Sequence, residues 1–227
     1  MHSVRLILLL CLTMSAYTQV IEPDEPEPVA PGLTTPPLSR DNTRQYNISI
    51  ISASYDINAR WQAYGYAGVV NDELEGDVFS VGVEYDTNRQ FFIRLAYFDF
   101  YQQETSARPD PEDRRLRIEP HWRLPLGERW QFVHRSRLER RYRDTTHQTR
   151  YRPRFSVSYQ FSQKINLDSS VELYYDLTDD EYQTTLYAAG LTYQWTDQVS
   201  TTARYIYGDG RTTNDAHIGL FQIGFKL

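Results

Sequence analysis

Arginine is the residue type with the greatest chemical potential in this chain, and it is concentrated in one stretch. The sequence contains 22 Arg against 2 Lys, and thirteen of these Arg lie within residues 112–154. That stretch holds six acidic residues, so its local charge is about +7, whereas the whole chain has a formal charge of −6. A guanidinium group is a rigid planar donor that holds carboxylates, sulfates and phosphates through paired hydrogen bonds. The stretch therefore indicates an anion site or a dense network of ion pairs.

The spacing of these arginines assigns them to one face of three neighbouring strands. Apolar residues alternate with them, as in Leu116, Ile118 and Trp122, and side chains two residues apart in a strand point the same way. Antiparallel neighbours lie about 5 Å apart, so the three strands would present one basic wall. The candidate anion-binding residues are Arg115, Arg117, Arg123, Arg135, Arg137, Arg141, Arg150, Arg152 and Arg154. The acidic partners expected inside the same structure are Glu119, Glu139 and Glu172.

Two interpretations of the basic wall remain open at this point. In the first, Arg and Glu pair across a narrow lumen and fill it, since buried charges need partners. In the second, the excess of Arg forms a track for anions, because charged rings set the selectivity of pores. The first gives a closed barrel with a structural or docking role. The second gives a channel for small anionic solutes such as acidic oligosaccharides.

The elements that would carry these residues are strands, because hydrophobicity alternates with a period of two along most of the chain. In the segment 165–177, six apolar residues share one face, interrupted by Ser169, while polar residues occupy the other. No segment of ten or more residues has helical periodicity. Eleven strands are predicted, at 45–56, 59–70, 77–86, 89–101, 114–124, 129–143, 147–161, 165–177, 181–195, 198–207 and 216–227.

The two faces and the connections favour an antiparallel transmembrane β-barrel. The connections alternate between short and longer, as in outer-membrane barrels with short periplasmic turns and longer outer loops. One face is apolar with aromatic residues such as Trp130, Tyr159 and Trp195 near its ends, where a girdle belongs. The other face is charged, whereas a soluble barrel would carry its apolar residues inside. Bacterial barrels have an even strand number, so we expect twelve strands, with a weak one within 33–44; ten is the second choice, and a linker threading the lumen the third.

The N-terminal residues predict export. Residues 1–20 read as a signal peptide, with Arg5 before a short apolar run and small residues near the expected cleavage site. Cys11 lies inside this run, so the mature chain would contain no cysteine. Residues 21–44 form an acidic linker with six of the eleven prolines, and 45–227 form the barrel. Together these features predict a bacterial outer-membrane location, with membrane lipid as a partner.

Two resemblances add to this reading. The segments HRSRLERRYR and TRYRPRFSVSYQF resemble a family of uncharacterised Gram-negative outer-membrane barrels with an R-x-R-L-E-x-R strand, best matched over 129–227. The architecture is similar to monomeric porins of the oligogalacturonate type, which have twelve strands and basic tracks in the lumen. The ending HIGLFQIGFKL looks like the C-terminal strand signal through which barrel-assembly machinery recognises its substrates. These resemblances imply a fold and a location, and only the second suggests a solute.

Enzymatic chemistry is not expected, although an outer-membrane enzyme acting on lipid or peptide is kept as a remote alternative. His134 and Ser136 share a face but no marked triad accompanies them, and a nucleophile needs an oriented base. Both fall on the apolar face, which predicts a bulge or shifted register there. His147 and His217 are expected to be solvent-exposed at loop ends. No metal, cofactor or nucleic-acid motif is found.

Overall fold

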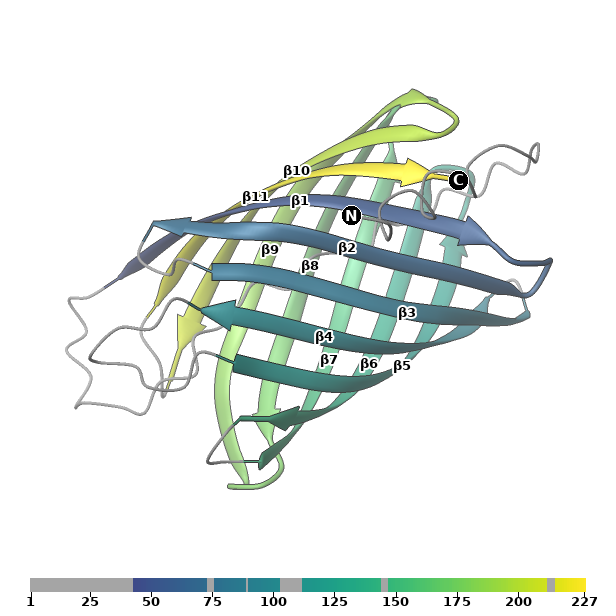
Figure 1. Ribbon diagram of the computed structural model, residues 1–227. Helices are drawn as coiled ribbons and strands as arrows, with labels where there is room; N and C mark the ends of the chain where they lie inside the picture. Colours follow the sequence, from purple (N-terminus) through teal and green to yellow (C-terminus); the bar gives the residue numbers. More distant parts are fainter. Residues whose placement is uncertain (1–42, 73–75, 89, 103–111, 144–146, 212–214) are drawn as a thin grey trace, which may run out of the picture.

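The computed structural model describes residues 43–227 apart from 73–75, 89, 103–111, 144–146 and 212–214, and these residues form a closed β-barrel (Figure 1). Each strand pairs with the one before it, and the first pairs with the last. The strands are β1 (Arg44–Asp56), β2 (Trp61–Asp72), β3 (Gly76–Asn88), β4 (Phe91–Gln102), β5 (Glu112–Leu126), β6 (Trp130–Tyr142), β7 (His147–Gln160), β8 (Ile165–Asp176), β9 (Glu181–Thr196), β10 (Val199–Gly210) and β11 (Ala216–Lys226). Every boundary lies within three residues of the sequence prediction. The all-β barrel is therefore confirmed.

The strand count and one pairing differ from the expectation. The described residues contain eleven strands, and neither the expected twelve nor the second choice of ten is found among them. An odd number closes because β1 and β11 run parallel, in one unbroken register from Arg44–Ala216 to Ser54–Lys226. All other pairs are antiparallel. Most of the strand sought in 33–44, the signal peptide and nearly all of the linker lie outside the described residues.

The connections are sorted between the two ends of the barrel, but more weakly than expected. At one end the strands are joined by 57–60, 89–90, 127–129, 161–164 and 197–198. At the other end they are joined by 73–75, 103–111, 143–146, 177–180 and 211–215, so only 103–111 is markedly long. We call these the turn end and the loop end. The chain enters β1 at the loop end, and β11 finishes at the turn end.

The outer face of the barrel is apolar, as the alternation predicted. Large hydrophobic side chains on every strand point away from the interior and are exposed, Leu95 by 48% and Trp195 by 58%. Trp130 and Tyr159 pack ring against ring near the turn end, with centroids 4.6 Å apart. A continuous exposed apolar surface of this extent is typical of a protein that faces lipid. No helix long and apolar enough to cross a membrane occurs in the described part of the chain.

The interior has two zones, which the sequence did not predict. Strands β5 to β8 contribute the charged zone. Facing it is an apolar zone whose main members are Tyr46, Ile48, Ile50, Ile206, Ile218 and Leu220, from β1, β10 and β11. Figure 1 shows β1 to β4 passing in front of β5 to β9 at a steep angle, so the two zones lie on opposite walls. The expectation of a densely charged inner face is therefore correct for only part of the barrel, because the buried residues of β1 and most of those of β11 are apolar.

Candidate functional site: the arginine-rich interior

The nine predicted arginines all point into the barrel from β5, β6 and β7. Eight of them are at most 5% exposed, and the side chain of Arg123 is 14% exposed. The strand register sets several of them directly opposite one another, as in Arg135–Arg154 and Arg137–Arg152 between β6 and β7. Like charges facing each other across a strand pair repel. Carboxylates must therefore lie among these groups for the barrel to close.

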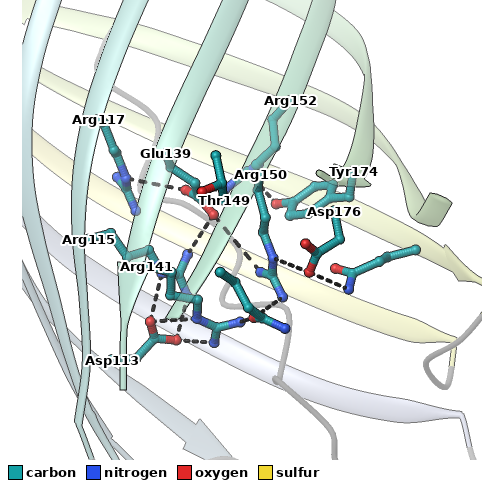
Figure 2. A network of polar contacts seen from close by, with 12 residues as sticks. Asp113, Arg115, Arg117, Glu139, Arg141, Thr149, Arg150, Arg152, Tyr174 and Asp176 are labelled. Atoms are coloured by element: carbon teal, nitrogen blue, oxygen red, sulfur yellow. Dashed lines mark hydrogen bonds and ion pairs between the residues drawn. The ribbon is translucent and has the colours of Figure 1, made fainter. Parts of the chain in front are cut away.

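Asp113 binds the arginines nearest the loop end. Its carboxylate accepts from Arg115 at 2.8 Å, lies 3.4 Å from Arg143, and is also paired with Arg141 (Figure 2). Arg115 and Arg141 are direct cross-strand partners, so one carboxylate screens their repulsion. Asp113 was expected to end the loop before β5, and its role was missed. The alternation of Asp113 with Arg115 was the signal that could have assigned it to the inner face.

Glu139 is the centre of the network, and no part of it is exposed. Its two oxygens lie near guanidinium groups from the two neighbouring strands, β5 and β7 (Figure 2). The nitrogen–oxygen distances are 3.8 Å to Arg115, 3.6 Å to Arg117, 3.9 Å to Arg150 and 3.3 Å to Arg152. One carboxylate is therefore shared among four cations and reduces the repulsion between them.

Two further buried carboxylates, one on β8 and one on β5, also contact the arginines. Glu172 of β8 contacts Arg135 at 2.6 Å and Arg152 at 2.7 Å. Glu119 of β5 contacts Arg137 at 2.7 Å. The three expected acidic residues thus lie among the arginines, each within ion-pair distance of at least one.

Two further ion pairs lie inside the barrel on other strands. Arg94 donates to Glu84 at 2.6 Å, between β4 and β3. Arg204 donates to Asp168 at 2.6 Å, from β10 to β8. These pairs extend the ionic interior beyond the three basic strands, to β3, β4, β8 and β10.

Aromatic side chains fill the space between the two zones. The guanidinium carbon of Arg117 lies 4.0 Å from the ring centre of Phe98, and that of Arg152 lies 3.8 Å from the ring of Tyr174. Phe98 is fully buried and Tyr174 is 1% exposed. Cation–π contacts of this kind are strongest where water is excluded.

The buried charges do not balance. Among the described residues that are buried, ten are arginines and six are carboxylates, an excess of four positive charges. The arginines are Arg94, Arg115, Arg117, Arg135, Arg137, Arg141, Arg150, Arg152, Arg154 and Arg204, and the acids are Glu84, Asp113, Glu119, Glu139, Glu172 and Asp176. The shared carboxylates reduce the repulsion, but the interior remains electropositive.

Comparison with known proteins supports a family and a fold. The model of the family described as "Protein of unknown function (DUF2490)" matches residues 43–217, from the start of β1 into β11. The chain belongs to the DUF2490 family. The match extends well beyond the 129–227 region in which the resemblance was strongest, and the R-x-R-L-E-x-R strand stays a prediction. No curated protein matches the sequence.

A solved structure supports the porin-like architecture of this DUF2490 protein. The NanC porin, determined in a rhombohedral crystal form, superposes with a TM-score of 0.52 at 16% sequence identity. The alignment covers 72% of this chain and 85% of the porin. At this level of identity the likeness concerns the fold alone. The barrel is therefore porin-like, and the similarity assigns no solute to this chain.

The residues considered for catalysis form a polar cluster on the outer face of the DUF2490 barrel. His134 Nε2 lies 3.0 Å from Ser136 Oγ, which lies 3.1 Å from the Tyr151 hydroxyl. The His134 ring stacks between Trp122 and Phe155, with centroids 5.9 and 4.7 Å away. Within the described residues, Nδ1 of His134 has no hydrogen-bond partner. A histidine base needs a third group to orient it, and this cluster lacks one.

The bulge expected at these two residues is absent. On either side of Ser136, Ile118 of β5 pairs with Leu138 of β6, and His121 pairs with Arg135. The two pairs belong to one continuous register between β5 and β6, so the register is not shifted at Ser136. Pro120 interrupts the ladder instead, since proline has no amide N–H to donate. His134 and Ser136 therefore face outward in an otherwise regular strand.

His147 and His217 lie outside this cluster. His147 is exposed, as expected, whereas His217 is half-buried, packs 5.3 Å from the Tyr207 ring and hydrogen-bonds to Tyr205. Among the described residues, no three His, Cys, Asp or Glu side chains are grouped closely enough to hold a metal ion.

Proposed function

We propose that this DUF2490 protein is an outer-membrane β-barrel whose interior is closed by a shared arginine–carboxylate network, with a structural or docking role. The observation that carries the proposal is the burial of the inward guanidinium groups, such as Arg152 at 0% and Arg137 at 2% exposed. Arginines that line a water-filled pore would be accessible to solvent. Here four of them share Glu139, and two of these four also stack on buried aromatic rings of adjacent strands.

The membrane placement rests on the outer surface and the porin-like fold. Exposed apolar side chains cover the outside of the barrel, while its charged groups lie within. The last strand carries Phe221, Ile223 and Phe225 on its outer face, which supports recognition by the barrel-assembly machinery. Membrane lipid is then the partner of the whole outer surface.

A second candidate function is a channel for small anionic solutes such as acidic oligosaccharides. The specific observation in its favour is the excess of four positive charges among the buried groups, together with the porin-like fold. In this case the nine arginines would bind the anion in turn, after a rearrangement that separates them from Glu119, Glu139 and Glu172. Charged rings of this kind select anions in pores.

Single-channel recording in a planar bilayer distinguishes the two candidates. We expect the purified barrel to insert without a steady current, because its guanidinium groups fill the lumen. Insertion is checked independently by the protease resistance of the reconstituted barrel. A steady anion-selective current, blocked by acidic oligosaccharides, would replace the closed-barrel proposal with the channel.

The orientation of the barrel gives a second test, on intact cells. The longest connection, between β4 and β5, belongs outside, so an epitope tag inserted after Ala107 should be reached by antibody. The same tag inserted after Asn88, the last residue of β3 before the short connection to β4, should be reached only after the outer membrane is permeabilised. Fractionation shows first that both proteins are in the outer membrane. Labelling of the Asn88 tag on intact cells would reverse the proposed topology.

A further inference from the structure

The outer face of the barrel carries two cations among its described strand residues, and they are neighbours. The strand alternation assigns every other Arg or Lys of β1 to β11 to the interior. Arg114 of β5 and Arg140 of β6 point outward and are exposed. Both lie near the loop end, where Arg140 is two residues from the end of β6 and Arg114 is the third residue of β5.

A shallow apolar groove lies beside these cations. It has a volume of about 410 Å³ and runs across β3, β4 and β5 on the outside of the barrel. Its walls are the outward side chains of Val81, Val83, Leu95, Tyr97 and Leu116. Sites for small molecules commonly have volumes in this range and apolar linings.

The strand register joins the groove to the cations. Leu116, at one side of the groove, is the direct cross-strand partner of Arg140, and Arg114 lies two residues further toward the loop end. Directly opposed side chains in a sheet are about 5 Å apart and diagonal ones about 7–8 Å. An apolar chain lying in the groove could therefore end within reach of both guanidinium groups.

The polar contacts of the two arginines differ. Arg140 donates to Thr149 Oγ1 at 2.6 Å and makes no ion pair with the described residues. Arg114 is paired with Glu112 and lies opposite Asp99, whose carboxylate accepts from the Tyr97 hydroxyl at 3.2 Å. Arg140 therefore has donors available for an anion, whereas Arg114, whose charge is offset by Glu112 and Asp99, contributes further N–H donors rather than net positive charge.

We propose that this groove and the two arginines form a binding site for a phosphorylated glycolipid of the outer leaflet. An acyl chain would occupy the groove and a phosphate would accept from Arg140 and Arg114, since arginine binds phosphate oxygens in pairs. The site rests on the proposed outer-membrane placement. The glycolipid is favoured over a phospholipid because the cations lie at the loop end, which faces outside in outer-membrane barrels, where phosphorylated glycolipid forms the outer leaflet.

The test measures the lipid that stays with the purified barrel. The full-length protein and the variant R114Q/R140Q are extracted in mild detergent, and bound lipopolysaccharide is quantified by native mass spectrometry. We expect the variant to retain about tenfold less, a change typical of losing a charge-assisted hydrogen bond. The matched control is R60Q/R129Q, which removes two exposed positive charges from the turn end and should retain the wild-type amount.

A further variant and a competition with phospholipid distinguish the proposed site from its alternatives. Val83→Trp fills the groove without changing charge and should also reduce retention. Titration with phosphatidylglycerol vesicles should not displace the glycolipid; displacement at equal concentration would assign the site to phospholipid and overturn the proposal. Equal retention by wild type and R114Q/R140Q would overturn it as well. Fractionation and heat-modifiable mobility report the outer-membrane barrel separately, so failure of the lipid site is distinguished from failure of the placement.

Discussion

Replacing Glu139 by Gln should lower the free energy of unfolding by about 3–5 kcal/mol, the range for breaking a buried ion pair by removing one partner. Glu139 is fully buried, and its carboxylate lies within 4 Å of four guanidinium groups. Gln keeps the size and shape of the side chain and removes only the charge. The excess of positive charge in the interior rises by one, at the point where the cations are densest.

Urea unfolding of the reconstituted barrel, followed by tryptophan fluorescence, measures this change. Glu112→Gln is the matched control, because Glu112 pairs with Arg114 on the outer face and its side chain is 38% exposed. An exposed pair contributes about 0–1 kcal/mol, so the control should unfold close to the wild type. Equal unfolding free energies for the Glu139 and Glu112 variants would mean that water reaches Glu139 and that the interior is open.

Replacing Arg137 and Arg152 together by Gln should also destabilise the barrel, by a total of about 3–5 kcal/mol rather than twice that amount. Three carboxylates lose a contact, since Arg137 binds Glu119 while Arg152 binds Glu172 and Glu139. The losses at Glu172 and Glu139 are partial, because Glu172 keeps Arg135 and Glu139 keeps three other cations. The change also removes the repulsion between two arginines that face each other across β6 and β7.

The same double variant tests the channel, because an open pathway predicts the opposite pattern. Arginines on a solvated wall contribute little to stability, so the variant would unfold like the wild type but conduct with reduced anion selectivity. We expect thermal stability to fall with no conductance in either protein. R60Q/R129Q serves again as the control for loss of two charges. Unchanged stability with altered selectivity would favour the channel.

The local pattern of the sequence was sufficient to predict the strands and the orientation of the arginines. A period of two assigns each side chain to a face once the strand is known, so all nine arginines were placed correctly relative to their strands. Asp113 was missed because β5 begins two residues before its predicted start, which moved this carboxylate into the preceding loop. An error of two residues at a strand end was enough to hide one of the acids that hold the network together.

The features that were not predicted depend on contacts between distant parts of the chain. In the first half of β1 the exposed residues Gln45, Asn47 and Ser49 are polar and the buried ones are apolar, the reverse of the expected orientation. Ile48 and Ile218 therefore belong to a second, apolar wall that the expected orientation did not predict. The parallel pairing that closes the barrel involves residues at opposite ends of the chain. The regular register at Ser136 was likewise not evident, because polar residues on an apolar face suggested an irregular strand.

The parallel seam between β1 and β11 has a consequence for how the barrel folds. Ser52 and Gln222 hydrogen-bond across it although 170 residues separate them, and no turn tethers the two strands. Bringing such distant segments together costs chain entropy before any of their contacts form. Pairing of this kind is therefore slow. The other ten strand pairs are neighbours in sequence and can form one hairpin at a time. The pairing of β1 with β11, which closes the barrel, is therefore the step that limits the folding rate.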